Sequence, residues 1–320
     1  MITSPISASI VICTLNRRDD IQRCVATITQ QSRVPEQLII VDAGDLGTVV
    51  NRLRNVCSAA SIEFIYCQDQ PSTTRQRNRG AENVTADIIF FLDDDVELDQ
   101  KYLERILFLY EADLEKKIGG ATGVIDPALP LGSRFWRYFV RLFLLAETRR
   151  DIGARLKPSN FPIHSTGLTE TRDCEIMAST AVSFRTDVFK KYLFDVNLSG
   201  YVMAEDVDLS YRVSRKYRLL TVPDAVFRHS KSPVSRNPTR EHEKRRLLFT
   251  QYFFQKNLGH SHWHQLARYW SLFGLALRYI YLGVRSGDMQ RFYGLCDGLR
   301  AAGKNRLLWH RHFVAGPLDH

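Results

Sequence analysis

The chain has 320 residues, 44% of them hydrophobic and 11% aromatic, so it can bury a substantial core and is not an intrinsically disordered protein. Its formal net charge is +9, and the excess lies in the C-terminal tail, because residues 228–320 hold 16 basic and 5 acidic side chains. Such a tail suggests an anionic partner, either a membrane surface or a nucleic acid, although a solvated helical surface would have the same composition.

The cysteine spacing and the hydropathy of the chain suggest that the protein is cytoplasmic. Six cysteines are scattered without a CxxC pair, which favours free thiols in a reducing environment. The opening MITSPISAS lacks the basic and long apolar regions of a secretory signal. No stretch reaches the roughly 18 uncharged apolar residues of a spanning helix. We therefore expect a cytoplasmic protein that does not cross a membrane.

The N-terminal part alternates strand and helix patterns. A buried β-branched run at 8–16 is followed by helical spacing at 18–31 and a second buried strand at 37–45. The alternation continues with a helix at 51–60, a strand at 62–68, a loop and helix at 72–84 and a strand at 87–95. This order predicts an α/β sheet with helices on both faces and ligands at the carboxyl ends of the strands.

Further along, the helical segments become aromatic and basic. Residues 99–113 predict an amphipathic helix, and 119–127 a strand and turn. Residues 133–150 predict a helix on which Arg134, Arg137 and Arg141 form a narrow stripe opposite aromatic side chains. Such a helix suits a membrane interface, and a buried core or oligomer contact fits it equally well.

Residues 174–192 and 222–230 return to mixed strands and helices, and the chain beyond Pro238 is expected to be mostly helical. Arg278 interrupts the long apolar run at 267–285, which favours a helix lying in the plane of a membrane over a spanning one. Three histidines at alternate positions occur on an expected interhelical loop: His260, His262 and His264. A chance grouping of surface histidines explains them better than a metal site does.

The stretch FFLDDDVELD places carboxylates at the end of a buried strand. Asp93 and Asp95 should point to the same side, since side chains alternate along an extended chain, and they can share Mg²⁺ or Mn²⁺. Asp94 should point the other way, and Glu97 should lie outside the ligand set. A solvated acidic turn is the alternative.

A second acidic pair, Glu205 and Asp206, begins an expected helix, where the helix dipole by itself favours negative charge. His229 follows another strand, and in isolation it is more often an ordinary polar or core residue than a ligand.

The motifs VICTLNR, IIVDAGD, TTRQRNRGAENVTADIIFFLDDD, AEDVDLSYRV and VPDAVFRHS, in this order over residues 7–235, resemble the family 2 glycosyltransferases. The resemblance implies a GT-A fold: a Rossmann-like mixed sheet flanked by helices, here followed by a C-terminal amphipathic helical region. We expect a catalytic domain at 1–235, with a donor half at about 1–125 and an acceptor half at about 126–235. A basic, aromatic, helical region at 236–320 would follow.

The resemblance also implies site residues. On the donor side, Thr14, Asn16 and Arg17 would hold the nucleotide, Asp42 would contact the base or ribose, Gly80 would allow close backbone approach, and the pocket would be lined by Arg77, Asn78 and Asp94. The metal would be bound by Asp93, Asp95 and His229. Asp206 would be the general base with Glu205 in reserve, and the acceptor side would be lined by Ser179 and Thr180. One departure concerns Asp42: many members read VDDGS where this chain reads VDAGD, so the second acid is missing.

The resemblance implies inverting transfer from a nucleoside-diphosphate sugar, a UDP-sugar being expected, with Mg²⁺ or Mn²⁺. The acceptor would be a hydroxyl of a glycan or a lipid-linked intermediate at the inner membrane face, in polysaccharide or glycolipid synthesis. A sugar-phosphate nucleotidyltransferase should carry a Gly-rich loop near the first strand, and VICTLNRRDD has no glycine. A nucleic-acid binder would expose a stacking platform, whereas the tail's aromatics fall in apolar helical runs, so we expect no nucleic-acid partner.

Overall fold

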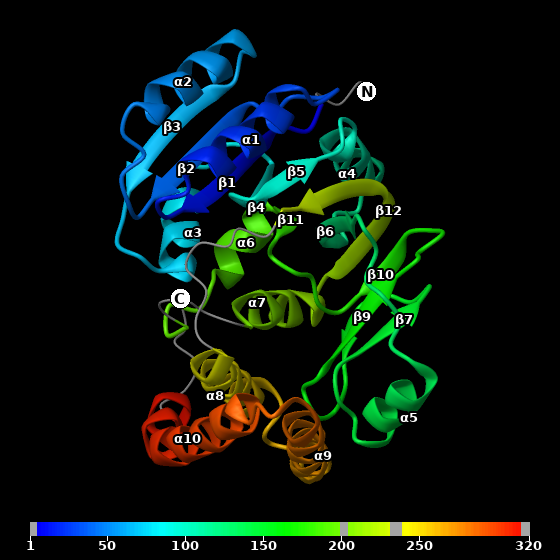
Figure 1. Ribbon diagram of the computed structural model, residues 1–320. Helices are drawn as coiled ribbons and strands as arrows, with labels where there is room; N and C mark the ends of the chain where they lie inside the picture. Colours follow the sequence, from blue (N-terminus) through cyan, green and yellow to red (C-terminus); the bar gives the residue numbers. More distant parts are fainter. Residues whose placement is uncertain (1–4, 199–203, 231–238, 315–320) are drawn as a thin grey trace.

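The computed structural model describes residues 5–198, 204–230 and 239–314, with side chains to residue 303 (Figure 1). The boundary expected between residues 235 and 236 lies outside the described residues.

A nine-stranded mixed sheet forms the centre of the molecule, in the order β10-β12-β6-β11-β4-β1-β2-β3 with β5 added beside β12. Strands β1 to β4 are parallel, whereas β11 runs antiparallel between β4 and β6. This confirms the predicted mixed sheet. The strands are β1 (Ala8–Thr14), β2 (Gln37–Asp42), β3 (Glu63–Gln68), β4 (Ile88–Asp93), β5 (Val96–Leu98), β6 (Ile118–Ile125), β10 (Arg172–Cys174), β11 (Ala181–Arg185) and β12 (Arg218–His229).

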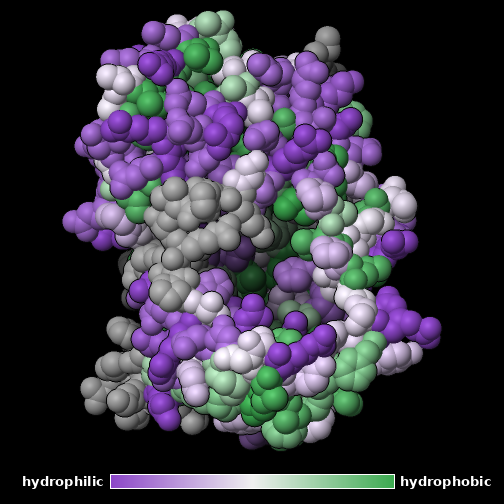
Figure 2. Space-filling view, in the orientation of Figure 1, coloured by the Kyte–Doolittle hydropathy of each residue, from purple (hydrophilic) through white to green (hydrophobic). Residues whose placement is uncertain are grey.

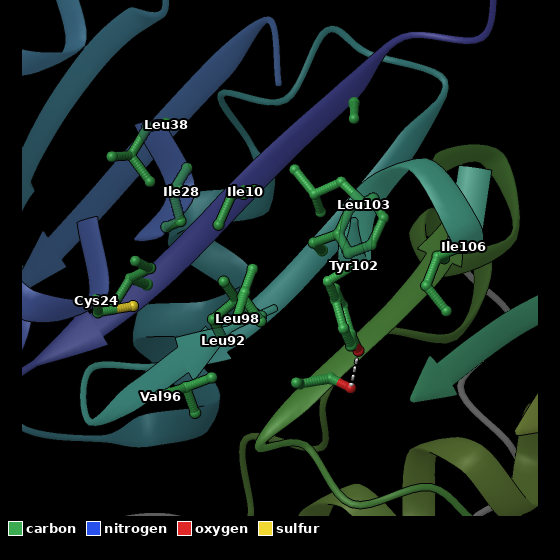
Figure 3. Close-up of a cluster of buried hydrophobic side chains, with 14 of the residues drawn as sticks. Ile10, Cys24, Ile28, Leu38, Leu92, Val96, Leu98, Tyr102, Leu103 and Ile106 are labelled. Carbon is green, nitrogen blue, oxygen red and sulfur yellow. Dashed lines mark hydrogen bonds between the residues drawn. The ribbon is translucent and has the colours of Figure 1, made fainter. Parts of the chain in front are cut away.

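Helices cover both faces of this sheet. They are α1 (Arg18–Thr29), α2 (Val49–Ala59), α3 (Thr73–Ala81), α4 (Tyr102–Ala112), α6 (Thr186–Tyr192) and α7 (Glu205–Ser214). Helices α1, α2 and α4 contribute to one core cluster, in which Ile10 and Leu92 of the sheet lie near Cys24 and Tyr102 (Figure 3). Helices α3, α6 and α7 contribute to a second cluster. The long buried strands β1, β2 and β4 are apolar on both sides for this reason.

A smaller three-stranded sheet lies beside helix α5 (Arg134–Leu142). Its strands are β7 (Glu147–Arg150), β8 (Arg155–Leu156) and β9 (Pro162–Thr166), in the order β7-β9-β8. The helix expected over 133–150 is therefore wrong in its second half. Leu144 adopts a left-handed φ of 50°, which ends the helical run, and the buried Glu147 carboxylate binds Arg141, Arg149 and Lys157.

The C-terminal part is helical, as expected: α8 (Thr239–Asn257), α9 (His262–Ser286) and α10 (Gln290–Val314). The histidine cluster was expected on a loop, but His262 and His264 lie within the first turn of α9. Among the helices that the structure describes, none combines the length and hydropathy needed to cross a bilayer.

A buried cluster of charges joins α8 to the sheet domain. The Lys256 ammonium lies 2.7 Å from Asp195 and 3.0 Å from Asp208, whose side chain is fully buried on α7. Asn257 donates to the same Asp208 carboxylate, at 3.0 Å. Burial alone would raise the pKa of Asp195, but Lys256 outweighs it and the pKa lies below its ordinary value. The Lys256 ammonium therefore connects α8 to Asp195, which precedes α7, and to Asp208 within α7.

Replacing Lys256 by Met should lower the free energy of unfolding by about 2 to 4 kcal/mol, because Asp208 stays buried with less positive charge beside it. Urea unfolding measures this loss. The deficit should shrink below about pH 4, because Asp195, whose pKa lies below its ordinary value, loses its ion pair with Lys256 as the pH falls through that pKa.

Lys256→Arg keeps the charge and should retain most of the stability. Lys216→Met, at an exposed lysine of α7's C-terminal flank, is the matched control and should change stability by less than about 0.5 kcal/mol. Equal losses in the two Met variants would contradict the bridging role of Lys256.

Candidate active site

The acidic run after β4 forms a turn rather than an extended strand. Asp93 is the last residue of β4, and Asp94 and Asp95 make the turn into β5. Asp93 and Asp95 therefore do not lie on one extended strand, as the predicted alternation of side chains required. The turn nevertheless brings them together.

His229 joins the two aspartates because β5 pairs antiparallel with β12, with Val96 opposite His229. The imidazole Nε2 lies 2.9 Å from Asp95 Oδ1. One ligand atom from each of Asp93, Asp95 and His229 lies within 4.8 Å of the others. The predicted metal set is thus assembled in space.

The chemistry of this set suits a divalent cation. Two carboxylates and one imidazole are donors that Mn²⁺ accepts, and carboxylate oxygens also suit Mg²⁺. Burial raises the pKa of Asp93, and Asp95 adds repulsion, while Arg77 opposes the rise. A cation among these groups would relieve that repulsion.

Asp94 faces the loop that follows β1. It accepts hydrogen bonds from Thr14 Oγ1 at 2.7 Å and from Arg17 Nη1 at 2.8 Å. Arg17 also lies 3.5 Å from Asp95. Burial raises the pKa of Asp94 to about 6 against these two opposing contacts. The expected nucleotide loop is therefore tied to the acidic turn.

Asn16 in the same loop is exposed, at a φ of 56°, and packs against the loop after β2. A Cβ on Gly44 would come within 2.3 Å of Asn16 Oδ1. A side chain at position 44 would therefore displace Asn16, so Gly44 permits the close contact between the two loops.

Two of the expected donor residues have protein partners. Asp42 is fully buried and accepts hydrogen bonds from Gly44 N, Leu46 N and the Tyr66 hydroxyl. The Asn78 amide binds the backbone of Phe194 in both directions. Their contacts with a donor remain predictions. Gly80 allows close backbone approach to the sheet, since an added Cβ would lie 2.3 Å from Val11 Cγ1.

Arg77 connects the two acidic groups. Its guanidinium lies 3.0 Å from Asp93 and 3.0 Å from Glu205, and the residue is only 3% exposed. It also lies over the Phe194 ring, 5.1 Å from the centroid. Phe194 thus supports both Arg77 and Asn78, and no motif in the sequence indicated it.

The second acidic group lies at the start of α7. Ser179 contacts both members: its hydroxyl donates to Glu205 at 3.4 Å, and its amide donates to Asp206 at 3.3 Å. The neighbouring Thr180 carbonyl accepts from the Asp93 amide at 3.0 Å. The expected acceptor-side residues therefore lie between the two acidic groups.

The two carboxylates differ in environment. Burial raises the pKa of Glu205, and Asp206 adds repulsion, while Arg77 opposes the rise. Burial also raises the pKa of Asp206. Glu205 is buried and bound by Arg77, whereas Asp206 is partly exposed. Asp206 is thus the more accessible of the pair.

Comparison with curated proteins gives partial matches. A Haloferax volcanii protein named glucosyl-dolichyl phosphate glucuronosyltransferase is 26% identical over 121 residues, which is 37% of this chain and 38% of that protein. Glycosyltransferase AglE from the same organism is 28% identical over 100 residues, 30% of this chain and 33% of AglE. The matches span well under half the length of these relatives.

Two solved structures share the fold. The mannosyltransferase PcManGT from Pyrobaculum calidifontis, in complex with GDP-Man and Mn²⁺, has a TM-score of 0.60, with 95% of this chain and 89% of that chain covered. GalNAc-T7, with UDP, GalNAc and Mn²⁺, has a TM-score of 0.57, with 79% and 50% covered. Both are 13% identical to this chain, a level that shows the fold alone.

The family comparison covers most of the sheet domain. The model of Glycosyl transferase family 2 matches residues 9–193, more than half of the chain. That span includes β1 to β4 and the acidic turn, and the fold agrees with the GT-A neighbours. The chain belongs to glycosyltransferase family 2 and has the GT-A fold.

Proposed function

We propose that this protein is an inverting glycosyltransferase that moves a sugar from a nucleoside-diphosphate sugar to a hydroxyl group. The observation that carries the proposal is the junction of two groups through Arg77: a set suited to a divalent cation, and a carboxylate pair beside Ser179. Leaving-group stabilisation and proton acceptance, the two requirements of glycosyl transfer, would lie on opposite sides of one buried guanidinium.

The donor would bind at the Asp93, Asp95 and His229 side. A bound Mg²⁺ or Mn²⁺ would supply positive charge for the departing diphosphate. Thr14 and Arg17 hold Asp94 and so fix the loop beside it. The neighbours bound to UDP or GDP-Man with Mn²⁺ support a nucleotide-sugar donor, and we keep a UDP-sugar as the first candidate.

The acceptor would bind at the Asp206 side. Its hydroxyl would lose a proton to Asp206 as it attacks, and the raised pKa of that carboxylate makes it a stronger base. Glu205, held by Arg77 and Ser179, would position the neighbouring groups. A direct displacement of this kind inverts the anomeric centre.

The acceptor we favour is a glycan or a lipid-linked intermediate, used in polysaccharide or glycolipid synthesis. A relative named for glucosyl-dolichyl phosphate, a lipid-linked sugar, supports this choice. The basic, aromatic C-terminal helices support peripheral action at the cytoplasmic face of the membrane. A second copy or other oligomer is not required by this proposal.

A donor screen tests the activity class. Thermal unfolding should shift upward with one nucleoside diphosphate only when Mn²⁺ or Mg²⁺ is present, since binding to the folded state alone raises stability. The matching sugar nucleotide should then be hydrolysed slowly. Absence of a metal-dependent shift with every nucleoside diphosphate would argue against the proposal.

Changing the two acidic groups separately should divide binding from transfer. Asp206→Asn should keep donor binding and lower the rate of transfer by about 100-fold or more, because the proton acceptor is lost. Asp95→Ala should lose metal-dependent donor binding. Titration calorimetry with Mn²⁺ and nucleotide, alongside transfer rates, measures both effects.

The exposed Asp224 offers the matched control, and Asp224→Asn should leave both measurements unchanged. Equal loss of binding in Asp206→Asn and Asp95→Ala would reject the assigned roles.

Removing the guanidinium should affect both groups together. Arg77→Met leaves Asp93 and Glu205 without their shared cation and should lower the free energy of unfolding by about 3 kcal/mol or more. Arg79→Met on the same helix removes only an exposed pair with Glu82 and should have little effect. Urea unfolding measures the free energy of unfolding of both variants. An Arg77→Met protein as stable as the unchanged protein would disprove the bridging role.

A further inference from the structure

Two helices distant in sequence form one surface. Phe143, directly after α5, stacks on Trp270 of α9 with ring centroids 4.8 Å apart, and the Trp270 indole donates to the Leu142 carbonyl at 2.7 Å. Trp136 of α5 contacts Tyr281 of α9, with centroids 5.6 Å apart. These contacts lock α5 and α9 into a single unit.

The outer side of this unit is apolar. We call it the aromatic face and define it by Phe135 and Tyr138 of α5 and by Trp263, Leu266, Tyr269 and Phe273 of α9, each more than half exposed. Figure 1 places both helices at the same end of the molecule, and Figure 2 shows hydrophobic residues gathered along that end.

The face continues along α9. Every exposed residue from Trp263 to Val284 is apolar or aromatic, and these residues recur at helical spacing on one side. At about 1.5 Å per residue the run is roughly 30 Å long. Monomeric soluble proteins rarely expose an apolar patch of that extent, so this face is expected to meet a partner.

The charged side chains within the two helices are all basic. Neither α5 nor α9 contains an Asp or Glu, whereas Arg134 and Arg285 are exposed at their ends. The Arg278 guanidinium lies 5.5 Å over the ring of Trp136, between the two helices. An anionic surface would complement this arrangement. A second copy of this chain would present the same positive charge rather than an anionic surface.

We propose that the aromatic face docks on a lipid bilayer containing anionic headgroups, with α5 and α9 lying in the plane of the interface. Aromatic side chains would enter the headgroup region, and the arginines would contact lipid phosphates. The inference rests on the proposed function at a membrane and deepens it by naming the surface and the lipid chemistry.

Vesicle flotation of the full chain, without nucleotide, metal or acceptor, tests the docking. Vesicles of phosphatidylcholine with phosphatidylglycerol should float the protein, more at about 0.05 M salt than at about 0.5 M, because salt screens exposed charges. Phosphatidylcholine alone should float much less. Brominated lipids should quench tryptophan fluorescence when the protein binds.

Two double variants sample the two helices. Trp263→Ser with Phe273→Ser, and Phe135→Ser with Tyr138→Ser, should each lower the partition coefficient by about tenfold or more, since each removes two apolar groups from the interface. Phe108→Ser, at a 67% exposed phenylalanine of α4, is the matched control and should bind as before. Thermal unfolding should confirm that all three variants fold.

Three results would overturn the proposal: no flotation on anionic vesicles, equal losses in the control and the face variants, or a dimer in sedimentation equilibrium that the α9 variant dissociates. The last result would assign the face to a second copy. Transfer to a soluble acceptor is measured separately, so failure of docking and failure of the proposed activity can be told apart.

Discussion

The structure depends on a buried guanidinium between carboxylates. Asp93, Glu205 and Asp206 would repel one another in a low-dielectric site, and Arg77 lies within ion-pair distance of the first two. The Phe194 ring lies against the guanidinium. Because Arg77 links β4 to α7, the strand that carries the acidic turn and the helix that carries Asp206 are held in one geometry.

The order of the sheet explains how distant residues reach this guanidinium. The antiparallel strand β11 lies next to β4, so Thr180, directly before it, bonds to Asp93 and Ser179 reaches α7. Strand β5 pairs with the end of β12 and so places His229 beside the acidic turn. A purely parallel sheet would not bring these segments together. The mixed topology is therefore part of how the site is built.

Much of the fold could be predicted from the sequence, because buried strands and amphipathic helices leave apolar patterns of different period. Asp93 and Asp95 were predicted to share a cation because side chains alternate along a strand, although it is the turn at Asp94 that brings them together. The addition of His229 to this set was predicted from the family resemblance. The C-terminal end of the helix expected over 133–150 could not be predicted, because a leucine in the left-handed conformation, as at Leu144, has no signature in the sequence. The pairing of Lys256 with Asp208 joins residues 48 positions apart, and no local pattern reports it.

The link from Lys256 to α7 has a further consequence for substrate selection. Helix α8 packs among the C-terminal helices and is fixed through Asp208 to the helix that begins with Glu205 and Asp206. If α5 and α9 lie in the bilayer interface, α7 and its two carboxylates are held at a fixed distance from the membrane surface. The length of the spacer between a lipid anchor and the reacting hydroxyl, rather than the identity of the sugar alone, would then decide which acceptors are used.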